Sequence, residues 1–197
     1  MMNLGGDERI YPASMTKIMT ALLTIENLPD LNETITVPED IFEELTAQDA
    51  SVAGFNPYEQ PTVRDLLYGV LLPSGADACE TLARAVGGSE EGFVAMMNQK
   101  AEELGLTNTH FENCTGLHND NHYSTCRDIA VLMSECLKSD TFREIVTREV
   151  YTTEATASHP EGITLYDTML HRFTSYEMST TLENGAVIEG RKDRIYR

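Results

Sequence analysis

The stretch "YPASMTKIMTALLTIE" (residues 11–26) combines a helix start with a Ser-x-x-Lys pair. Pro12 and Ser14 are typical of a helix N-terminus, and the apolar residues after them recur at spacings of three and four, so we predict an amphipathic helix here. Ser14 and Lys17, three positions apart, then lie on one face. Ser14 is either a helix cap beside a solvated Lys17, or a nucleophile beside its base. The predicted apolar stripe consists of Ile18, Met19, Leu22, Leu23 and Ile25.

The pair has a clear chemical sense. A serine hydroxyl is a poor nucleophile until a base removes its proton. A lysine serves as that base only where burial or a nearby cation disfavours its charged form. The apolar neighbours Met15, Ile18 and Met19 offer a partly dry setting, and the helix N-terminus adds positive potential. Such a pair is nevertheless common by chance, so alone it favours the cap.

Composition narrows the classes of function. The chain has 197 residues, 41% of them hydrophobic and 23% charged, which is typical of one globular domain. Its 14 basic and 32 acidic residues give a net charge of −18. This sign argues against nucleic acid or an anionic membrane surface as a partner, because such binding needs a basic protein. No apolar run approaches the roughly 18 residues of a transmembrane helix.

The middle of the chain is predicted to be helical. Helices are expected at 63–72 behind a Thr62–Asp65 capping box, after Ser74, after Ser89, and at 126–138 behind Thr125. Strand patterns are found elsewhere. They comprise a short strand at 33–40, strand character at 144–157, and a turn followed by a buried strand at 183–190; residues 44–60 are predicted to be mostly loop.

A second hydroxyl stands out in "LLPSGADA" (residues 71–78). Ser74 lies between two predicted helices, where a loop can present a side chain to a cleft. A hydroxyl beside the base could relay a proton to a leaving nitrogen. The alternative is that Ser74 simply caps the helix that follows it.

Three segments of the chain, which include Ser14, Lys17 and Ser74, resemble a known protein family. The segments at 12–26, 61–78 and 93–133 together resemble the serine D-alanyl-D-alanine carboxypeptidases, low-molecular-mass penicillin-binding proteins related to class A β-lactamases. The resemblance spans about residues 9–150. It implies an α+β fold, a helical part plus an antiparallel sheet built from both chain ends, with the sheet incomplete here. We therefore expect residues 1–197 to form a single, truncated catalytic domain, helical over about 12–145 and strand-rich over 146–197.

The resemblance also assigns roles. Ser14 would be the acylated nucleophile, with its backbone N–H forming half of an oxyanion hole; Lys17 would be the general base and Ser74 the proton relay. Gly75 and Ala76 would contact substrate, Ala76 standing where the family has asparagine. The implied reaction removes the terminal D-alanine from a peptidoglycan stem peptide through an acyl-enzyme. β-Lactams would acylate the same serine, and no metal or organic cofactor is implied.

Two departures from the family pattern matter. Ala76 removes an amide that helps to orient substrate in the family. No Lys-Thr-Gly sequence occurs in the chain, and in the family this motif binds the substrate carboxylate and lies beside the second oxyanion donor. Loss of one oxyanion donor costs on the order of 10²–10³ in rate. The alternative function is therefore an impaired or inactive fragment that binds penicillin or wall peptides. One permitted set of codons for residues 190–197, read one base later, encodes Glu-Gly-Lys-Thr-Gly-Tyr-Thr, so we hypothesise a changed reading frame, which sequencing of the coding DNA would test.

Other interpretations remain open at this point. Residues 1–14 lack a basic and an apolar signal region, whereas the family is extracytoplasmic; membrane association would use segments absent from this chain. A class A β-lactamase is the nearest rival. A zinc peptidase could use His118, Asp120 and His122. The four cysteines are expected to be packed thiols, with a bridge between Cys114 and Cys126 as the alternative.

Overall fold

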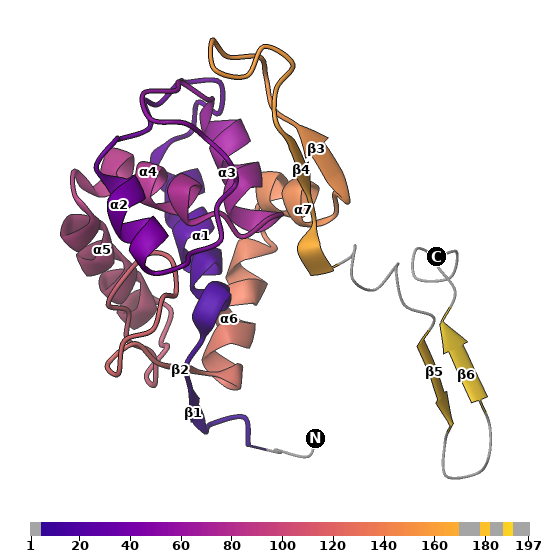
Figure 1. Cartoon of the computed structure of the whole chain (residues 1–197). Coiled ribbons are helices and arrows are strands. Elements are labelled where there is room, and N and C mark those ends of the chain that lie inside the picture. The colour runs from indigo at the N-terminus through magenta and orange to yellow at the C-terminus, as the bar shows by residue number, and fades with distance from the viewer. Residues whose placement is uncertain (1–4, 170–177, 182–186, 191–197) are drawn as a thin grey trace.

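The computed structural model describes residues 5–169, 178–181 and 187–190. Its centre is helix α1 (Lys17–Asn27), entered through a 3₁₀ turn, η1 (Ala13–Thr16). Every residue from Lys17 to Thr24 is buried. The predicted helix is confirmed, but it does not have one exposed face as an amphipathic helix would, because other helices pack around α1 (Figure 1). Its hydroxyls tolerate burial because Thr20 donates to the Cys114 carbonyl (2.6 Å) and Thr24 to the Thr20 carbonyl (2.8 Å).

The helices around α1 begin where capping chemistry places them. Thr62 and Asp65 form the predicted capping box, and the side chains of Ser89 and Thr125 accept hydrogen bonds from Gly92 and Asp128 backbone N–H groups. These three helix starts are confirmed. The surrounding helices are α2 (Ile41–Ala47), α3 (Val63–Leu71), α4 (Ala76–Gly87), α5 (Glu90–Glu103), α6 (Cys126–Cys136) and α7 (Asp140–Val146).

Two short helices were missed from the sequence. α2 occupies part of the predicted loop at 44–60 and buries Ile41 and Leu45, one turn apart. α7 begins after Ser139, whose hydroxyl accepts from Phe142 N, and it takes the first residues of the predicted strand at 144–157. Each helix has seven residues, so neither repeats its apolar spacing often enough to be recognised.

The strands form three separate two-stranded antiparallel sheets. A sheet built from both chain ends had been expected. Among the described residues no such sheet forms, because β1 pairs with β2 from the middle of the chain. The predicted strand at 33–40 reduces to an isolated bridge between Thr34 and Thr62. At 183–190, the strand part is present and the turn lies outside the described residues. The pairs are β1 (Arg9–Ile10) with β2 (Ser124–Thr125), β3 (Val150–Thr152) with β4 (Thr164–Tyr166), and β5 (Met178–Thr181) with β6 (Val187–Gly190).

The β3–β4 hairpin is fixed to α3 by one buried carboxylate. Asp65 accepts from the Tyr151 hydroxyl (2.9 Å) and from Glu154 N (3.2 Å), while its other oxygen completes the capping box. The Tyr151 ring stacks on Tyr68 at a centroid distance of 3.7 Å. After β4 the chain returns to α3, where Thr168 N donates to the Leu72 carbonyl (3.3 Å). The hairpin therefore delivers residues 167–169 to the end of α3 that precedes Ser74.

All four cysteines are unpaired, so the Cys114–Cys126 bridge does not form. Cys114 is buried, whereas Cys126 is exposed at the start of α6. Cys79 and Cys136 are buried in helices, as expected for packed thiols. Across the described part of the chain, no helix combines the length and the apolar character needed to cross a membrane.

Candidate active site

Ser14 and Lys17 are placed as a site and not as a helix cap. Ser14 lies in η1, exposed, and neither η1 nor α1 has a side-chain cap, so the cap interpretation of Ser14 is wrong. Lys17 is only 6% exposed, so it is not a solvated lysine. Its Nζ donates to the Thr115 carbonyl at 2.6 Å. A short hydrogen bond from a buried amine fixes the position of that nitrogen.

Ser74 is held in an unusual state for a serine. Its φ is +63°, in the left-handed region that costs a non-glycine residue on the order of 1–3 kcal/mol. Its Oγ is buried and has no hydrogen-bond partner within the described structure. Gly75, not Ser74, is the N-cap residue of α4, so the cap interpretation fails here as well. An unpaired buried hydroxyl costs about 1–3 kcal/mol, a cost that is often retained for function.

Ser14, Lys17 and Ser74 line one cavity of about 610 Å³. Apolar residues of α3, α6 and α7 form much of its wall, and residues 167–169 lie at its edge. Gly75 and Ala76 are not among the residues that line it. Both are buried, and Ala76 N donates to the Ser51 carbonyl at 2.7 Å. The structure thus brings the three hydroxyl and amine groups together and keeps the two predicted substrate contacts behind the surface.

Asp77 organises the wall beside Ser74. This fully buried carboxylate accepts hydrogen bonds from the N–H groups of Ala53 (2.7 Å), Gly54 (3.0 Å) and Phe55 (3.1 Å). Gly75 leaves room for that contact, because a Cβ there would lie 2.7 Å from both Ala53 N and Asp77 Oδ1. Sequence reasoning missed Asp77, although an aspartate in the first turn of a helix was a visible signal.

A segment about one hundred residues away supports η1 from the other side. Gly116, at φ +85°, packs so closely on Ala13 that a Cβ would overlap the Ala13 carbonyl oxygen. His122 Nδ1 accepts from Glu112 N (3.2 Å), so its Nε2 carries the proton and donates to Thr16 Oγ1 (2.7 Å). Burial lowers the pKa of His122 to about 4, which keeps the ring neutral at pH 7.

The proposed zinc ligands do not converge. Both ring nitrogens of His122 are engaged with protein partners, while His118 is exposed and lies 3.4 Å from Asp120. Within the described residues, three metal-type ligand atoms come within 4.8 Å of one another at Glu80, Glu90 and Cys114. That cluster was not foreseen from the sequence.

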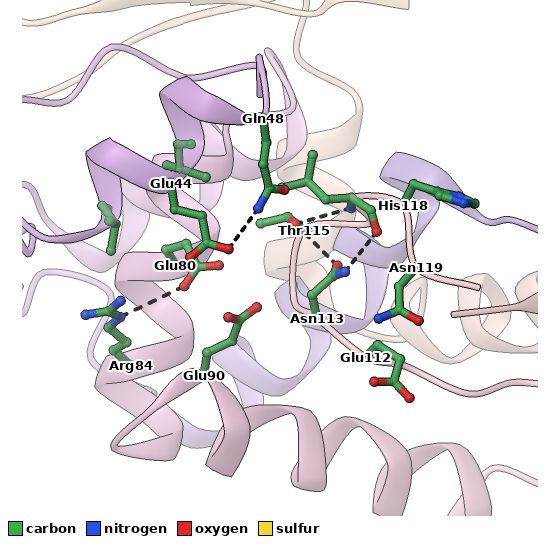
Figure 2. A pocket seen from close by; sticks show the side chains of 13 residues that line it. Glu44, Gln48, Glu80, Arg84, Glu90, Glu112, Asn113, Thr115, His118 and Asn119 are labelled. Atoms are coloured by element: carbon green, nitrogen blue, oxygen red, sulfur yellow. Dashed lines mark hydrogen bonds and ion pairs between the residues drawn. The ribbon is translucent and has the colours of Figure 1, made fainter. Parts of the chain in front are cut away.

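Glu80 and Glu90 of this cluster line a second cavity, of about 240 Å³, and Figure 2 shows their side chains there. Cys114 Sγ donates to Glu80 Oε1 (3.3 Å), and Cys114 N donates to Glu90 Oε1 (3.2 Å). Burial, together with the charge of Glu90, raises the pKa of Glu80 to about 7. Desolvation also raises the pKa of Cys114 well above its usual range, so the thiol keeps its proton.

Comparison with known proteins gives a consistent result. Residues 1–177 match the family described as D-alanyl-D-alanine carboxypeptidase, peptidase S11. The chain is 41% identical over 155 residues to D-alanyl-D-alanine carboxypeptidase DacF of Bacillus subtilis, and 38% identical over 154 residues to a D-alanyl-D-alanine carboxypeptidase of Streptomyces sp. strain K15. These matches cover 78% and 74% of this chain, but 40% and 53% of those relatives.

Solved structures show the same relationship. The crystal structure of the Streptomyces K15 DD-transpeptidase superimposes with a TM-score of 0.78 at 31% identity, covering 96% of this chain and 76% of that one. Penicillin-binding protein 6B of Escherichia coli gives 0.76 at 25% identity, covering 93% and 59%. The expected α+β fold of the DD-peptidases is thereby confirmed. With a family match over most of its length, the chain belongs to the serine-type D-alanyl-D-alanine carboxypeptidase family.

Proposed function

We propose that Ser14, Lys17 and Ser74 form an acyl-transfer centre that removes the terminal D-alanine from peptidoglycan stem peptides. The observation that carries this proposal is the unpaired, buried hydroxyl of Ser74 in the cavity that Ser14 and Lys17 also line. Residues 1–197 would act as one catalytic domain. The chain spans about half or less of the length of these curated relatives, so their activity is a proposal for this chain.

The chemistry follows from the positions of the three groups. Lys17 Nζ takes the proton from Ser14 Oγ as this oxygen bonds to the carbonyl carbon of the penultimate D-alanine. The Ser14 N–H stabilises the resulting oxyanion. Ser74 relays this proton from Lys17 to the amide nitrogen as the C–N bond breaks and D-alanine leaves. A water then attacks the ester, and the proton it loses returns Ser14 to its resting state.

Gly75 and Ala76 are proposed to contribute to substrate binding only indirectly, by holding the backbone beside Ser74, because their own N–H groups donate to the Gly69 and Ser51 carbonyls. Both lie outside the cavity lining, and an alanine side chain offers no hydrogen bond. The proposed site of action is extracytoplasmic, and β-lactams are the proposed covalent inhibitors, because they present a strained amide to the same serine. Family membership supports the site of action and the inhibitor class. The exposure of Ser14 further supports its access to an inhibitor.

A second function is favoured by one sequence fact. The chain contains no Lys-Thr-Gly. In the family this motif lines one wall of the active-site cleft, where it provides a substrate-binding cation and lies beside an oxyanion donor. Acylation would then be slower by on the order of 10²–10³, and the chain would act as a binder of penicillin or wall peptides with little turnover. Of residues 190–197, which the proposed change of reading frame concerns, 191–197 lie outside the described part of the structure.

Intact mass after incubation with benzylpenicillin tests the nucleophile. We expect an adduct of one penicillin on the wild type and none on Ser14→Ala, with Ser158→Ala, an exposed serine, as the matched control. Lys17→Arg should also lose the adduct, because a guanidinium cannot accept the proton. Absence of an adduct on the wild type would contradict the proposal.

Two rates then separate the alternatives. Release of D-alanine from a D-Ala-D-Ala peptide identifies the carboxypeptidase, whereas a stable adduct without release identifies the binder. Regeneration of free protein within seconds would instead indicate a β-lactamase-like hydrolase.

A further inference from the structure

The carboxylates of Glu80 and Glu90 converge on one residue, Cys114, from two different helices. Figure 2 shows both side chains at the 240 Å³ cavity, Glu80 on α4 and Glu90 on the first turn of α5. Glu80 is 8% exposed and accepts from the Cys114 thiol, while Glu90 accepts from the Cys114 backbone N–H. The side chain and the main chain of Cys114 are thus held at the same time.

Cys114 and the next residue hold α1 in turn. The Cys114 carbonyl accepts from Thr20 (2.6 Å), and the Thr115 carbonyl accepts from Lys17 Nζ (2.6 Å). Cys114 and Thr115 are consecutive and both buried, so close packing leaves little room for a displacement of the first to be absorbed before it reaches the second. A shift of the Cys114 amide therefore changes the place where the amine of Lys17 is anchored.

We propose that Glu80 and Glu90 are positioning residues for Lys17, acting through the backbone of Cys114 and Thr115. The inference rests on the proposed function, in which Lys17 is the base. Neither carboxylate lines the 610 Å³ cavity, so neither touches a substrate there. Their part is to set the distance over which Lys17 takes the proton from Ser14, and misplacement by about 1 Å can cost on the order of 100-fold in rate.

The electrostatics of the carboxyl pair supply a readout. The ligand atoms of Glu80 and Glu90 lie within 4.8 Å of each other, so ionising both places two negative charges side by side. Arg84, with its Nε 3.9 Å from Glu80, offers partial compensation from the exposed side. Other titratable groups around the pair are the Cys114 and Cys79 thiols and, along the same cavity, Glu44, Glu112 and His118.

The experiment measures the rate of acylation by benzylpenicillin in the full chain. Glu90→Ala removes the acceptor of the Cys114 N–H and should slow acylation by about 10- to 100-fold. Glu90→Gln retains an oxygen that can accept this bond, so it should restore most of the rate. Glu91→Ala, an exposed acid on the same helical turn, is the control and should leave the rate unchanged.

The pH profile distinguishes positioning from a general loss of stability. In the wild type, ionisation of Glu80 near pH 7, beside the Glu90 carboxylate, should change how Cys114 is held and add a limb to the acylation profile there. Glu80→Gln removes that ionisation and should remove the limb. Equal rates and the same profile in all four variants would overturn the proposal, as would a loss in Glu90→Gln as large as in Glu90→Ala.

A second measurement does not depend on acylation. In protein labelled with [¹³C]lysine, the Cε signal of Lys17, assigned through Lys17→Arg, should shift in Glu90→Ala and not in Glu91→Ala. If wild-type protein is never acylated, the proposed function fails while this signal still tests the positioning. An unchanged Lys17 signal in a folded Glu90→Ala protein would overturn the inference.

Discussion

At the scale of single residues, the site is built from groups that are costly to bury. Lys17 is almost completely buried, and its Nζ donates to a carbonyl oxygen. The Ser74 hydroxyl is buried without a partner on a left-handed backbone. Such costs are typical of side chains whose partner is a substrate, because the missing contacts are completed only on binding.

His122 should make stability depend on pH. Burial lowers its pKa from 6.5 to about 4 in the folded protein, so between these values the unfolded chain binds more protons. Stability should therefore fall as the pH falls from 6.5 to 4, by about 2–3 kcal/mol. Urea unfolding at several pH values measures this loss.

The comparison that isolates this effect uses His122→Gln, whose amide can still donate to Thr16 and accept from Glu112. The stability of His122→Gln should not show this fall between pH 6.5 and 4. The exposed control His118→Gln should behave as the wild type. Other groups, Glu80 among them, titrate equally in all three proteins and cancel in the differences. A pH dependence that persists in His122→Gln would contradict the assignment.

At the scale of elements, one aspartate joins the start of α4 to the segment at 51–55. The Asp77 carboxylate receives three backbone N–H groups from that segment. We expect Asp77→Asn to destabilise the protein by about 2–4 kcal/mol, because hydrogen bonds to a charged acceptor are the stronger ones and the new NH₂ group faces other donors. Thermal and urea unfolding measure this loss.

The matched control for that change is Asp49→Asn. Asp49 is exposed, lies just before the same segment, and has φ +49°, a conformation that asparagine accepts. Its substitution should leave stability within about 0.5 kcal/mol of the wild type. Equal effects of the two substitutions would show that Asp77 has no special part in fixing the segment.

Helix starts could be predicted from the sequence, but helix environments could not. Thr62, Ser89 and Thr125 act within three or four residues of themselves, so local pattern reveals them. The burial of α1 depends on five helices that pack around it, and its polar Thr20 is satisfied by Cys114, 94 residues away. The sheet prediction failed for the same reason, because strand partners are set by the tertiary arrangement.

The residues of the site likewise fall into those that could be predicted from the sequence and those that could not. Ser14, Lys17 and Ser74 carry a recognisable spacing, and the structure places them at one cavity. Thr115 contributes a backbone carbonyl, which any residue could supply, so its identity holds no signal. Glu80 and Glu90 look like ordinary helix-surface acids in sequence, and their convergence on Cys114 requires α4 and α5 to be in place.

At the scale of the whole molecule, charge is the dominant feature. A net charge of −18 on 197 residues places many like charges on one surface, and their repulsion opposes the compact state. Salt screens this repulsion, with a Debye length of about 30 Å at 0.01 M and about 8 Å at 0.15 M. We expect the melting temperature to rise by several degrees when sodium chloride is raised from about 0.01 to 0.15 M.

An uncharged solute at equal osmolality is the control for that experiment and should give a smaller rise. A melting temperature that falls with salt would mean that the ion pairs on the surface, such as Arg84–Asp40, outweigh the repulsion. The same titration followed by acylation rate would show whether the screened charges lie close enough to the cavity to affect Ser14.

The close approach of Gly116 to Ala13 has a consequence for synthesis of the protein. Lys17 finds its acceptor 98 residues later, and Thr16 meets His122 after 106. A ribosome therefore releases the Ser-x-x-Lys segment long before the residues that shape it exist. A nascent chain that stops short of residue 113 lacks the acceptor of its lysine, so penicillin reactivity would not begin before the 113–122 segment has emerged and folded back.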